Sequence, residues 1–170
     1  MIAMPEIATH RYDPGIGVCL NICSLEDVEA LRIVDRLRRE FRPTLKPNYL
    51  ARRRTTECWL TAAAAKVLGR PFQRRPAYFF LGDFSHAADP SRPATLAVPL
   101  SRLPADAITF TLGDSMSVAE QPARRVYILD EMVALFVTEP AIAEFGLSDR
   151  HGFQARFIEL QLWDGFSLRA

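Results

Sequence analysis

The chain of 170 residues is 49% hydrophobic and 24% charged, which is typical of a globular domain and excludes a disordered or collagen-like chain. No apolar run approaches the roughly 20 residues of a membrane span, and the first residues lack the pattern of a secretory signal. We therefore expect one soluble, cytoplasmic domain over residues 1–170 that has no membrane contact.

Positive charge is concentrated in one segment. Residues 32–75 contain 13 of the 21 Lys and Arg residues and three acidic residues, a net charge of +10, while the rest of the chain carries −9. Such a segment indicates an anionic ligand or partner: nucleic acid, a phosphate-bearing molecule or an acidic protein face. The alternative is that its arginines pair with acidic residues elsewhere in the same domain.

The three cysteines are odd in number, which indicates free thiols in a reducing compartment. Cys19, Cys23 and Cys58 could form a zinc site with His10, but their spacing differs from the C-x2-C pairs of zinc knuckles. We predict buried thiols and no metal site.

The predicted elements begin with a short buried strand at residues 16–22, after two glycines. A first helix begins at Ser24, with Asp27 as a capping partner, and ends before Pro43. Apolar residues recur at helical spacing and predict its buried stripe: Val28, Leu31, Val34, Leu37 and Phe41.

A second helix is predicted from about Thr55 to Leu68, where Gly69 stops it. Its predicted apolar face consists of Trp59, Leu60, Ala63 and Val67. Residues 42–54 read as a basic connector that ends in Arg52, Arg53 and Arg54. Because a helix N-terminus attracts anions, three arginines just before it predict an anion site.

From residue 76 the pattern changes to strands. Strands are expected at 77–83, 95–100, 107–112 and 126–129, the second and third at hairpin-like spacing. A helix at 130–137 precedes a last strand at 155–163. There Phe157, Glu159 and Gln161 face one side, and Ile158, Leu160 and Leu162 the other. A basic helical part (about 24–75) followed by a strand-rich part (about 76–170) predicts an α+β fold with antiparallel strands.

Two polar groups in the strand-rich part could carry chemistry. Ser115, after Gly113 and Asp114, resembles the nucleophile of GDSL-type hydrolases, with Asp149 and His151 as its partners. The spacing of Asp149 and His151 differs from the D-x-x-H of those enzymes. A turn in which Ser115 caps the next segment is the simpler interpretation. In a cleft, Glu159 would have a raised pKa and suit catalysis; otherwise it is an exposed strand residue.

The strand at 77–83 is rich in aromatic residues. Tyr78 and Phe80 point to one side of it and could stack on a base or a nicotinamide ring. The alternative is that this strand is ordinary core.

This order of elements, with Ser115-Met116-Ser117 after one strand and Glu159 on a late strand, resembles ADP-ribosyltransferase-like domains over most of the chain. The resemblance implies a split, two-sheet core that binds NAD as substrate. It gives Glu159 the role of the catalytic glutamate and Ser115 and Ser117 that of the Ser-x-Ser pair. Phe157 stands where relatives have Gln or Glu.

The leading hypothesis is therefore an NAD-dependent ADP-ribosyltransferase or NAD glycohydrolase, such as a bacterial toxin or effector. The residues expected to hold NAD are Arg11, Arg52, Arg53, Arg54, Tyr78, Ser115 and Ser117. A second hypothesis is a nucleic-acid-binding protein or nuclease that uses residues 32–75 to contact phosphates. A third is a non-catalytic protein whose basic helices bind an acidic partner.

Overall fold

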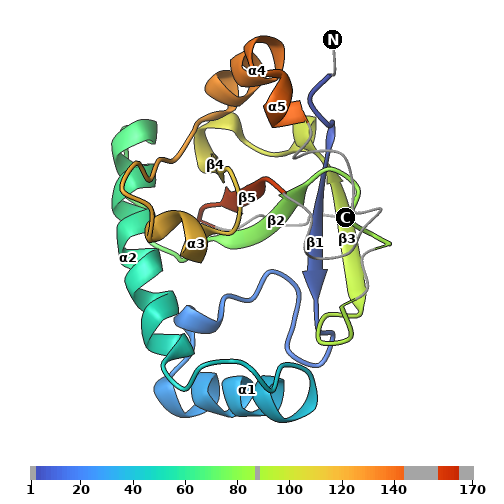
Figure 1. Ribbon diagram of the computed structural model, residues 1–170, viewed down its shortest axis with the longest axis vertical. Coiled ribbons are helices and arrows are strands. Elements are labelled where there is room, and N and C mark those ends of the chain that lie inside the picture. The colour runs from blue at the N-terminus through green and yellow to red at the C-terminus, as the bar shows by residue number, and fades with distance from the viewer. Residues whose placement is uncertain (1–2, 87–88, 144–156, 165–170) are drawn as a thin grey trace.

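The computed structural model describes residues 3–86, 89–143 and 157–164. Five antiparallel strands form one sheet in the order β3-β1-β2-β5-β4: β1 (Ile7–Tyr12), β2 (Ala77–Leu81), β3 (Ala94–Pro99), β4 (Ile108–Thr111) and β5 (Glu159–Leu162) (Figure 1). Two long helices separate β1 from β2, α1 (Asp27–Glu40) and α2 (Tyr49–Leu68), and three shorter ones separate β4 from β5: α3 (Ser115–Ala119), α4 (Leu129–Thr138) and α5 (Pro140–Ala143). The predicted α+β class is confirmed.

The sheet is narrow between β1 and β2. These strands share only the register pairs Ala8–Leu81 and Thr9–Phe80, whereas β1 and β3 share six pairs and β5 shares four with each neighbour. In Figure 1 the β3-β1 half runs vertically, and the β2-β5-β4 half crosses the view. The resemblance implies two sheets; the described strands instead form one sheet of two halves joined at a narrow junction.

The two faces of the sheet differ in polarity. One face packs against α4 and forms the main core, with Phe79, Leu81, Phe110, Leu160 and Leu162 among its buried residues. On the other face lie polar side chains, because alternate residues of a strand point to opposite sides: Thr9, Arg11, Tyr78, Thr109, Thr111, Glu159 and Gln161. The predicted alternation around Glu159 is confirmed, and the polar face becomes the wall of a cleft.

The second helix packs over one end of the polar face. Leu60 and Ala64 of α2 contact Trp163 and Val126, with Tyr78 at the edge of this cluster. The first helix lies against the N-terminal half of α2 rather than on the sheet, through Ala30, Val34 and Leu50.

The predicted strand at 16–22 is wrong, because the first strand is Ile7–Tyr12. Backbone N–H groups of Ile16 and Gly17 donate to the Asp13 carbonyl, so this stretch turns instead of pairing with a strand. The stretch closes as a 3-10 turn, Ile22–Ser24, capped by Asn21.

Both helices begin elsewhere than predicted. The first begins at Asp27 instead of Ser24, and Val28 and Leu31 of the predicted stripe are 63% and 49% exposed, since Ala30 and Val34 form its buried face. The second begins at Tyr49, six residues early, because Asn48 rather than Thr55 precedes its first turn. Val67 at its other end is exposed. Arg52, Arg53 and Arg54 therefore belong to the first two turns of α2 and do not precede it.

The strands expected at 77–83, 95–100 and 107–112 are confirmed as β2, β3 and β4, but the hairpin expected between the last two is wrong. β3 and β4 do not form a hairpin: they lie at opposite edges of the sheet, beside β1 and β5. Two 3-10 turns, Leu100–Arg102 and Ala105–Ala107, occupy the connection between them. The strand expected at 126–129 is a single bridge between Tyr127 and Phe110, and α4 follows close to its predicted place. Of the strand expected at 155–163, residues 155 and 156 lie outside the described residues.

Across the described ranges, no helix is both long and apolar enough to cross a bilayer.

Candidate functional site

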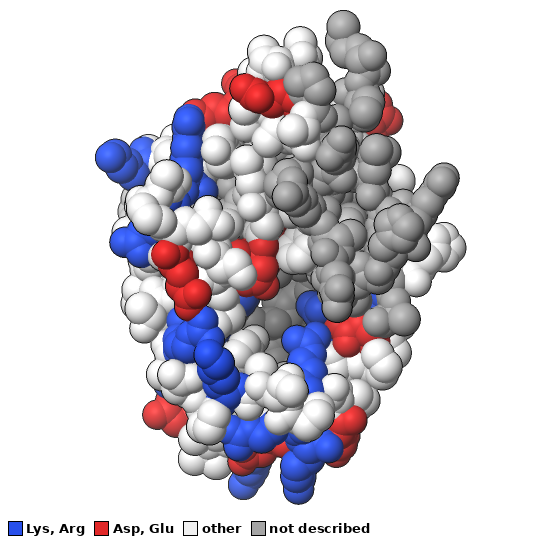
Figure 2. All heavy atoms as spheres, viewed as in Figure 1, with Lys and Arg blue, Asp and Glu red and all other residues white. Residues whose placement is uncertain are grey.

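A cleft of about 1160 Å³ lies between the polar face of the sheet, α1 and the N-terminal half of α2. Its walls also include the loop after β1, the segment before β3 and the turn after β4. Figure 2 shows the hollow at the centre of this face, with Lys and Arg side chains along its lower rim. The cleft is large enough for a nucleotide-sized ligand and is bordered by positive charge.

Most of the site residues predicted from the sequence meet at this cleft. Its lining includes six of the eight: Arg11, Arg52, Arg53, Tyr78, Ser117 and Glu159. Ser115 is fully buried beside Glu159 and does not line the cleft. Arg54 lies outside it, where its guanidinium pairs with Asp27 at 2.7 Å.

Glu159 lies at the centre of the polar wall. It begins β5, in register with Phe80 on one side and Thr111 on the other, and is 7% exposed. Burial, the largest effect, raises the pKa of Glu159 to about 7. The Arg53 cation lowers this pKa, and the nearby Asp114 raises it. The carboxyl group can therefore gain or lose a proton near neutral pH.

A chain of hydrogen bonds orients this carboxyl group. The Trp163 Nε1–H donates to the Thr109 hydroxyl (2.8 Å), which donates to the Gln161 side-chain oxygen (2.9 Å). The Gln161 amide then donates to Glu159 Oε1 (3.1 Å). The Ser115 hydroxyl also lowers the pKa of Glu159, although its buried Oγ has no hydrogen bond of good geometry among the described residues. Glu159 is thus held from one side and open to the cleft on the other.

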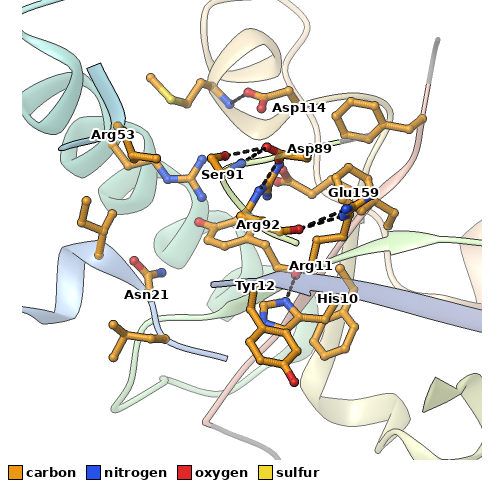
Figure 3. A pocket seen from close by; sticks show the side chains of 18 of the residues that line it. His10, Arg11, Tyr12, Asn21, Arg53, Asp89, Ser91, Arg92, Asp114 and Glu159 are labelled. Carbon is orange, nitrogen blue, oxygen red and sulfur yellow. Dashed lines mark hydrogen bonds and ion pairs between the residues drawn. The ribbon is translucent and has the colours of Figure 1, made fainter. Parts of the chain in front are cut away.

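Arg53 reaches from α2 towards the middle of the cleft (Figure 3). Its guanidinium lies over the Tyr78 ring, 4.1 Å from the centroid, and its Nε is 3.5 Å from Glu57 Oε1, one turn along the same helix. Burial alone would lower the pKa of Arg53, but its interactions with Tyr78 and Glu159 keep the pKa above its usual value. Arg53 therefore stays a cation next to the Glu159 carboxyl group.

A second group of basic residues lies across the cleft, around Asp89. The Asp89 Oδ2 pairs with Arg92 at 2.7 Å and with Arg42 at 3.2 Å, and its Oδ1 accepts a hydrogen bond from the Ser91 hydroxyl. Figure 3 shows Asp89 joined by dashed lines to Ser91 and Arg92. We call Arg11, Arg42 and Arg92 with Asp89 and Ser91 the basic corner.

Arg11 is the most buried cation of the basic corner, at 6% exposure. Its Nε and Nη2 donate to the Arg92 carbonyl at 3.2 and 3.0 Å, and Nη1 lies 3.5 Å from the Phe84 carbonyl. Within the described residues Arg11 forms no ion pair, and burial lowers its pKa. Three guanidinium groups around a single carboxylate leave the basic corner with excess positive charge, which favours an anionic ligand.

His10 has both ring nitrogens in hydrogen bonds. Its Nδ1 lies 2.7 Å from the Tyr78 carbonyl, and its Nε2 accepts from the Cys19 N–H at 2.9 Å, so Nδ1 carries the proton. Burial lowers its pKa. In the part of the chain that the structure describes, no cluster of His, Cys, Asp or Glu is suited to a metal ion. The prediction of buried thiols is wrong: Cys58 is exposed, and Cys19 and Cys23 are only half-buried.

The positive segment 32–75 is partly neutralised within the fold. Seven of its 13 basic residues form ion pairs, mostly with acidic residues outside the segment: Arg36, Arg42, Arg52, Arg53, Arg54, Arg70 and Arg75. This pairing is the alternative expected from the opposite charges of the two parts. The nucleic-acid and acidic-partner hypotheses stay predictions.

Sequence reasoning missed every residue of the basic corner except Arg11, and it missed Glu57, which holds Arg53. Arg42, Asp89 and Arg92 stand in connectors, and their convergence depends on how the chain folds back on β1. Glu57 lies inside α2, where a glutamate reads as a solvent-facing residue.

The hydrolase alternative requires an exposed serine. Ser115 is fully buried, at the start of α3, and the helix is capped by Asp114 rather than by Ser115. Asp149 and His151 lie outside the described residues, so no triad can be assembled from the residues that are described.

Comparisons of this chain with protein-family models, with curated proteins and with solved structures found no match.

Proposed function

We propose that the cleft binds NAD as a substrate and that the protein breaks the bond between nicotinamide and ribose, as an ADP-ribosyltransferase or an NAD glycohydrolase. The observation that carries this proposal is Glu159: a buried carboxyl group with a pKa of about 7, held by Gln161 in the wall of a basic cleft. Carboxyl groups whose pKa is shifted in this way are concentrated at functional sites.

The ionised form of Glu159 would do the chemical work. As the bond to nicotinamide breaks, the ribose becomes positively charged, like an oxocarbenium ion. A carboxylate fixed beside that ribose accepts a hydrogen bond from its hydroxyl group and stabilises the charge. Nicotinamide leaves with the bonding electron pair, and water or an acceptor group then attacks the ribose carbon.

The basic corner would hold the pyrophosphate. Arg42 and Arg92 already bind a carboxylate, Asp89, and guanidinium groups bind carboxylate and phosphate through the same paired geometry. Arg11 supports them as a buried cation anchored on backbone carbonyls. This assignment replaces the anion site expected at Arg52–Arg54, because α2 begins before those residues.

Aromatic side chains next to Glu159 support a site for the nicotinamide ring. Phe80 is the register partner of Glu159 and lines the same cleft. Arg53 covers one face of the Tyr78 ring and Phe84 stacks on the Phe80 ring, so each of these two residues offers a ligand at most one ring face.

Nicotinamide release from NAD tests this proposal directly. We expect release by the wild-type protein, alone or with a cell lysate as acceptor, and a loss of at least about 100-fold in Glu159→Gln. Arg92→Ala should raise KM for NAD roughly tenfold, because a charge-assisted contact to phosphate is lost. Arg54→Ala, outside the cleft, is the matched control and should behave as the wild type.

The acid limb of the activity gives a second readout. Because the carboxylate form is the active one, the rate should rise with pH through about 7. The proposal is refuted if the wild type neither releases nicotinamide nor binds NAD under these conditions.

A further inference from the structure

Glu57 is a buried acid that the proposed chemistry does not use. It lies on α2, fully buried, and faces β2 and the loop after β1. Its Oε1 accepts hydrogen bonds from the Tyr78 hydroxyl (2.9 Å) and the Asn21 amide (2.8 Å). Its Oε2 lies 3.6 Å from Arg75 Nη1. A buried carboxyl group with this many partners determines where those partners sit.

The partner that matters for the cleft is Arg53. The Arg53 Nε is 3.5 Å from Glu57 Oε1, and its guanidinium lies over the Tyr78 ring, whose hydroxyl group Glu57 also holds. Glu57 therefore fixes both the cation and the aromatic ring on which that cation rests. The Arg53 side chain is only 11% exposed, so water screens these interactions weakly.

The charge of Arg53 also acts on the Glu159 carboxyl group. Arg53 is the main group that lowers the pKa of Glu159, and Glu159 in turn raises the pKa of Arg53. Tyr78, on which Arg53 rests, is two residues along β2 from Phe80, the register partner of Glu159, and Arg53 and Glu159 line the same cleft. The Arg53 Nε that pairs with Glu57 is not available to Glu159.

We propose that Glu57 is a positioning residue: by holding Arg53 against Tyr78, it limits the contact of Arg53 with Glu159. The catalytic consequence rests on the proposed function, but the coupling between the two acids does not. Glu57 touches neither the cleft nor a ligand in it; it acts only through Arg53 and Tyr78.

The other groups around the two acids define what a test must hold constant. Asp114 and Ser115, before and within α3, and Gln161 on β5 also act on Glu159. Tyr49 acts on Arg53 from within α2. Arg75 and Cys23 face Glu57 from the segment before β2 and from the loop after β1. A substitution at Glu57 leaves all of these in place.

The test measures the pKa of Glu159 by a carboxyl-carbon NMR titration, in which the Glu159→Gln variant assigns the signal. In Glu57→Gln, the side-chain oxygen can still accept from Tyr78 and Asn21, but the charge that holds Arg53 is gone. Arg53 then turns to its remaining acid, and we expect the pKa of Glu159 to fall from about 7 by about one unit. Arg54→Met, one residue along the same helix but paired with Asp27, should leave the pKa of Glu159 unchanged.

A double-mutant cycle identifies the route. Arg53→Met alone should raise the pKa of Glu159, and in that background Glu57→Gln should have no further effect, because its intermediary is absent. An unchanged pKa in Glu57→Gln, or an equal fall with and without Arg53, overturns the proposal. If Glu57→Gln does not fold, Glu57→Asp replaces it; its shorter side chain keeps the charge but loosens Arg53, so a smaller fall is expected and no fall overturns the proposal.

Activity adds an independent arm. In Glu57→Gln the acid limb of nicotinamide release should move to lower pH together with the pKa of Glu159, an effect that a general loss of stability would not produce. If the wild type releases no nicotinamide, the proposed function fails while the NMR titration still decides the role of Glu57.

Discussion

The burial of Glu159 should make the folded protein less stable as the pH rises. Its ordinary pKa is 4.5, and in the folded chain the pKa is about 7. Below 4.5 the group is protonated whether the chain is folded or unfolded. Between these values the unfolded chain ionises it and the folded chain does not, so stability is lost progressively until the pH passes the folded pKa.

The magnitude follows from the gap between the two values. At about 1.4 kcal/mol per pKa unit, the change from 4.5 to about 7 corresponds to about 3 kcal/mol of unfolding free energy. In Glu159→Gln this loss is absent, because the amide resembles the protonated acid and does not ionise. The variant should therefore become more stable than the wild type above neutral pH, although it lacks the proposed catalytic group.

Urea unfolding of both proteins at about pH 5 and about pH 8 measures this effect. His10 works in the opposite direction: burial lowers its pKa below 6.5, so its contribution to stability is lost as the pH falls. The difference between wild type and variant removes such shared contributions. The same difference at both pH values would refute the reasoning and mean that Glu159 is not desolvated.

Three further substitutions test other parts of the structure. Asp114→Asn keeps the side-chain oxygen that caps α3 but removes the charge that raises the pKa of Glu159. The pKa of Glu159 should therefore fall, and a constant value in a carboxyl NMR titration would contradict the assignment. Trp163→Phe removes the hydrogen bond to Thr109 from a side chain 1% exposed; we expect a loss of about 2 kcal/mol in urea unfolding, and an unchanged midpoint would mean that the bond contributes nothing. Gly69→Ala meets no neighbouring atom within 4 Å but must adopt a φ of +69°, so thermal unfolding should report a loss of about 1 kcal/mol, whereas a gain would argue against the left-handed cap.

Local patterns predicted those parts of the fold that depend on neighbouring residues. The alternation of apolar and polar residues in β5 placed Glu159 and Gln161 on one face, and both lie on the polar face of the sheet, where Glu159 lines the cleft. Gly69 ends α2 in the left-handed conformation, as its position suggested. In these cases the deciding interactions lie within a few residues of each other.

The first strand could not be predicted in this way. Thr9, His10 and Arg11 are buried polar residues, so the segment lacks the apolar pattern of an ordinary core strand. Each is satisfied by a distant partner: Thr9 donates to the Gly82 carbonyl at 2.6 Å, and His10 lies against Tyr78. Only the folded chain brings those partners to the strand.

Apart from Arg11, the residues of the basic corner were missed, as was Glu57, for the same physical reason. The Asp89–Arg42 pair joins residues 47 positions apart, and Glu57 meets Arg53 on its own helix but Asn21 and Tyr78 on other segments. The excess of positive charge in residues 32–75 did indicate an anion site. It could not separate arginines that line the cleft from those, such as Arg54, that pair away from it.

Residues from both halves of the sheet line the cleft. Arg11 stands on β1 in the β3-β1 half, and Glu159 stands on β5 in the other, with two register pairs between β1 and β2 to connect them. A ligand that touched both residues would act as a brace across that junction. Ligand binding would then slow the exchange of backbone amide hydrogens where β1 pairs with β2.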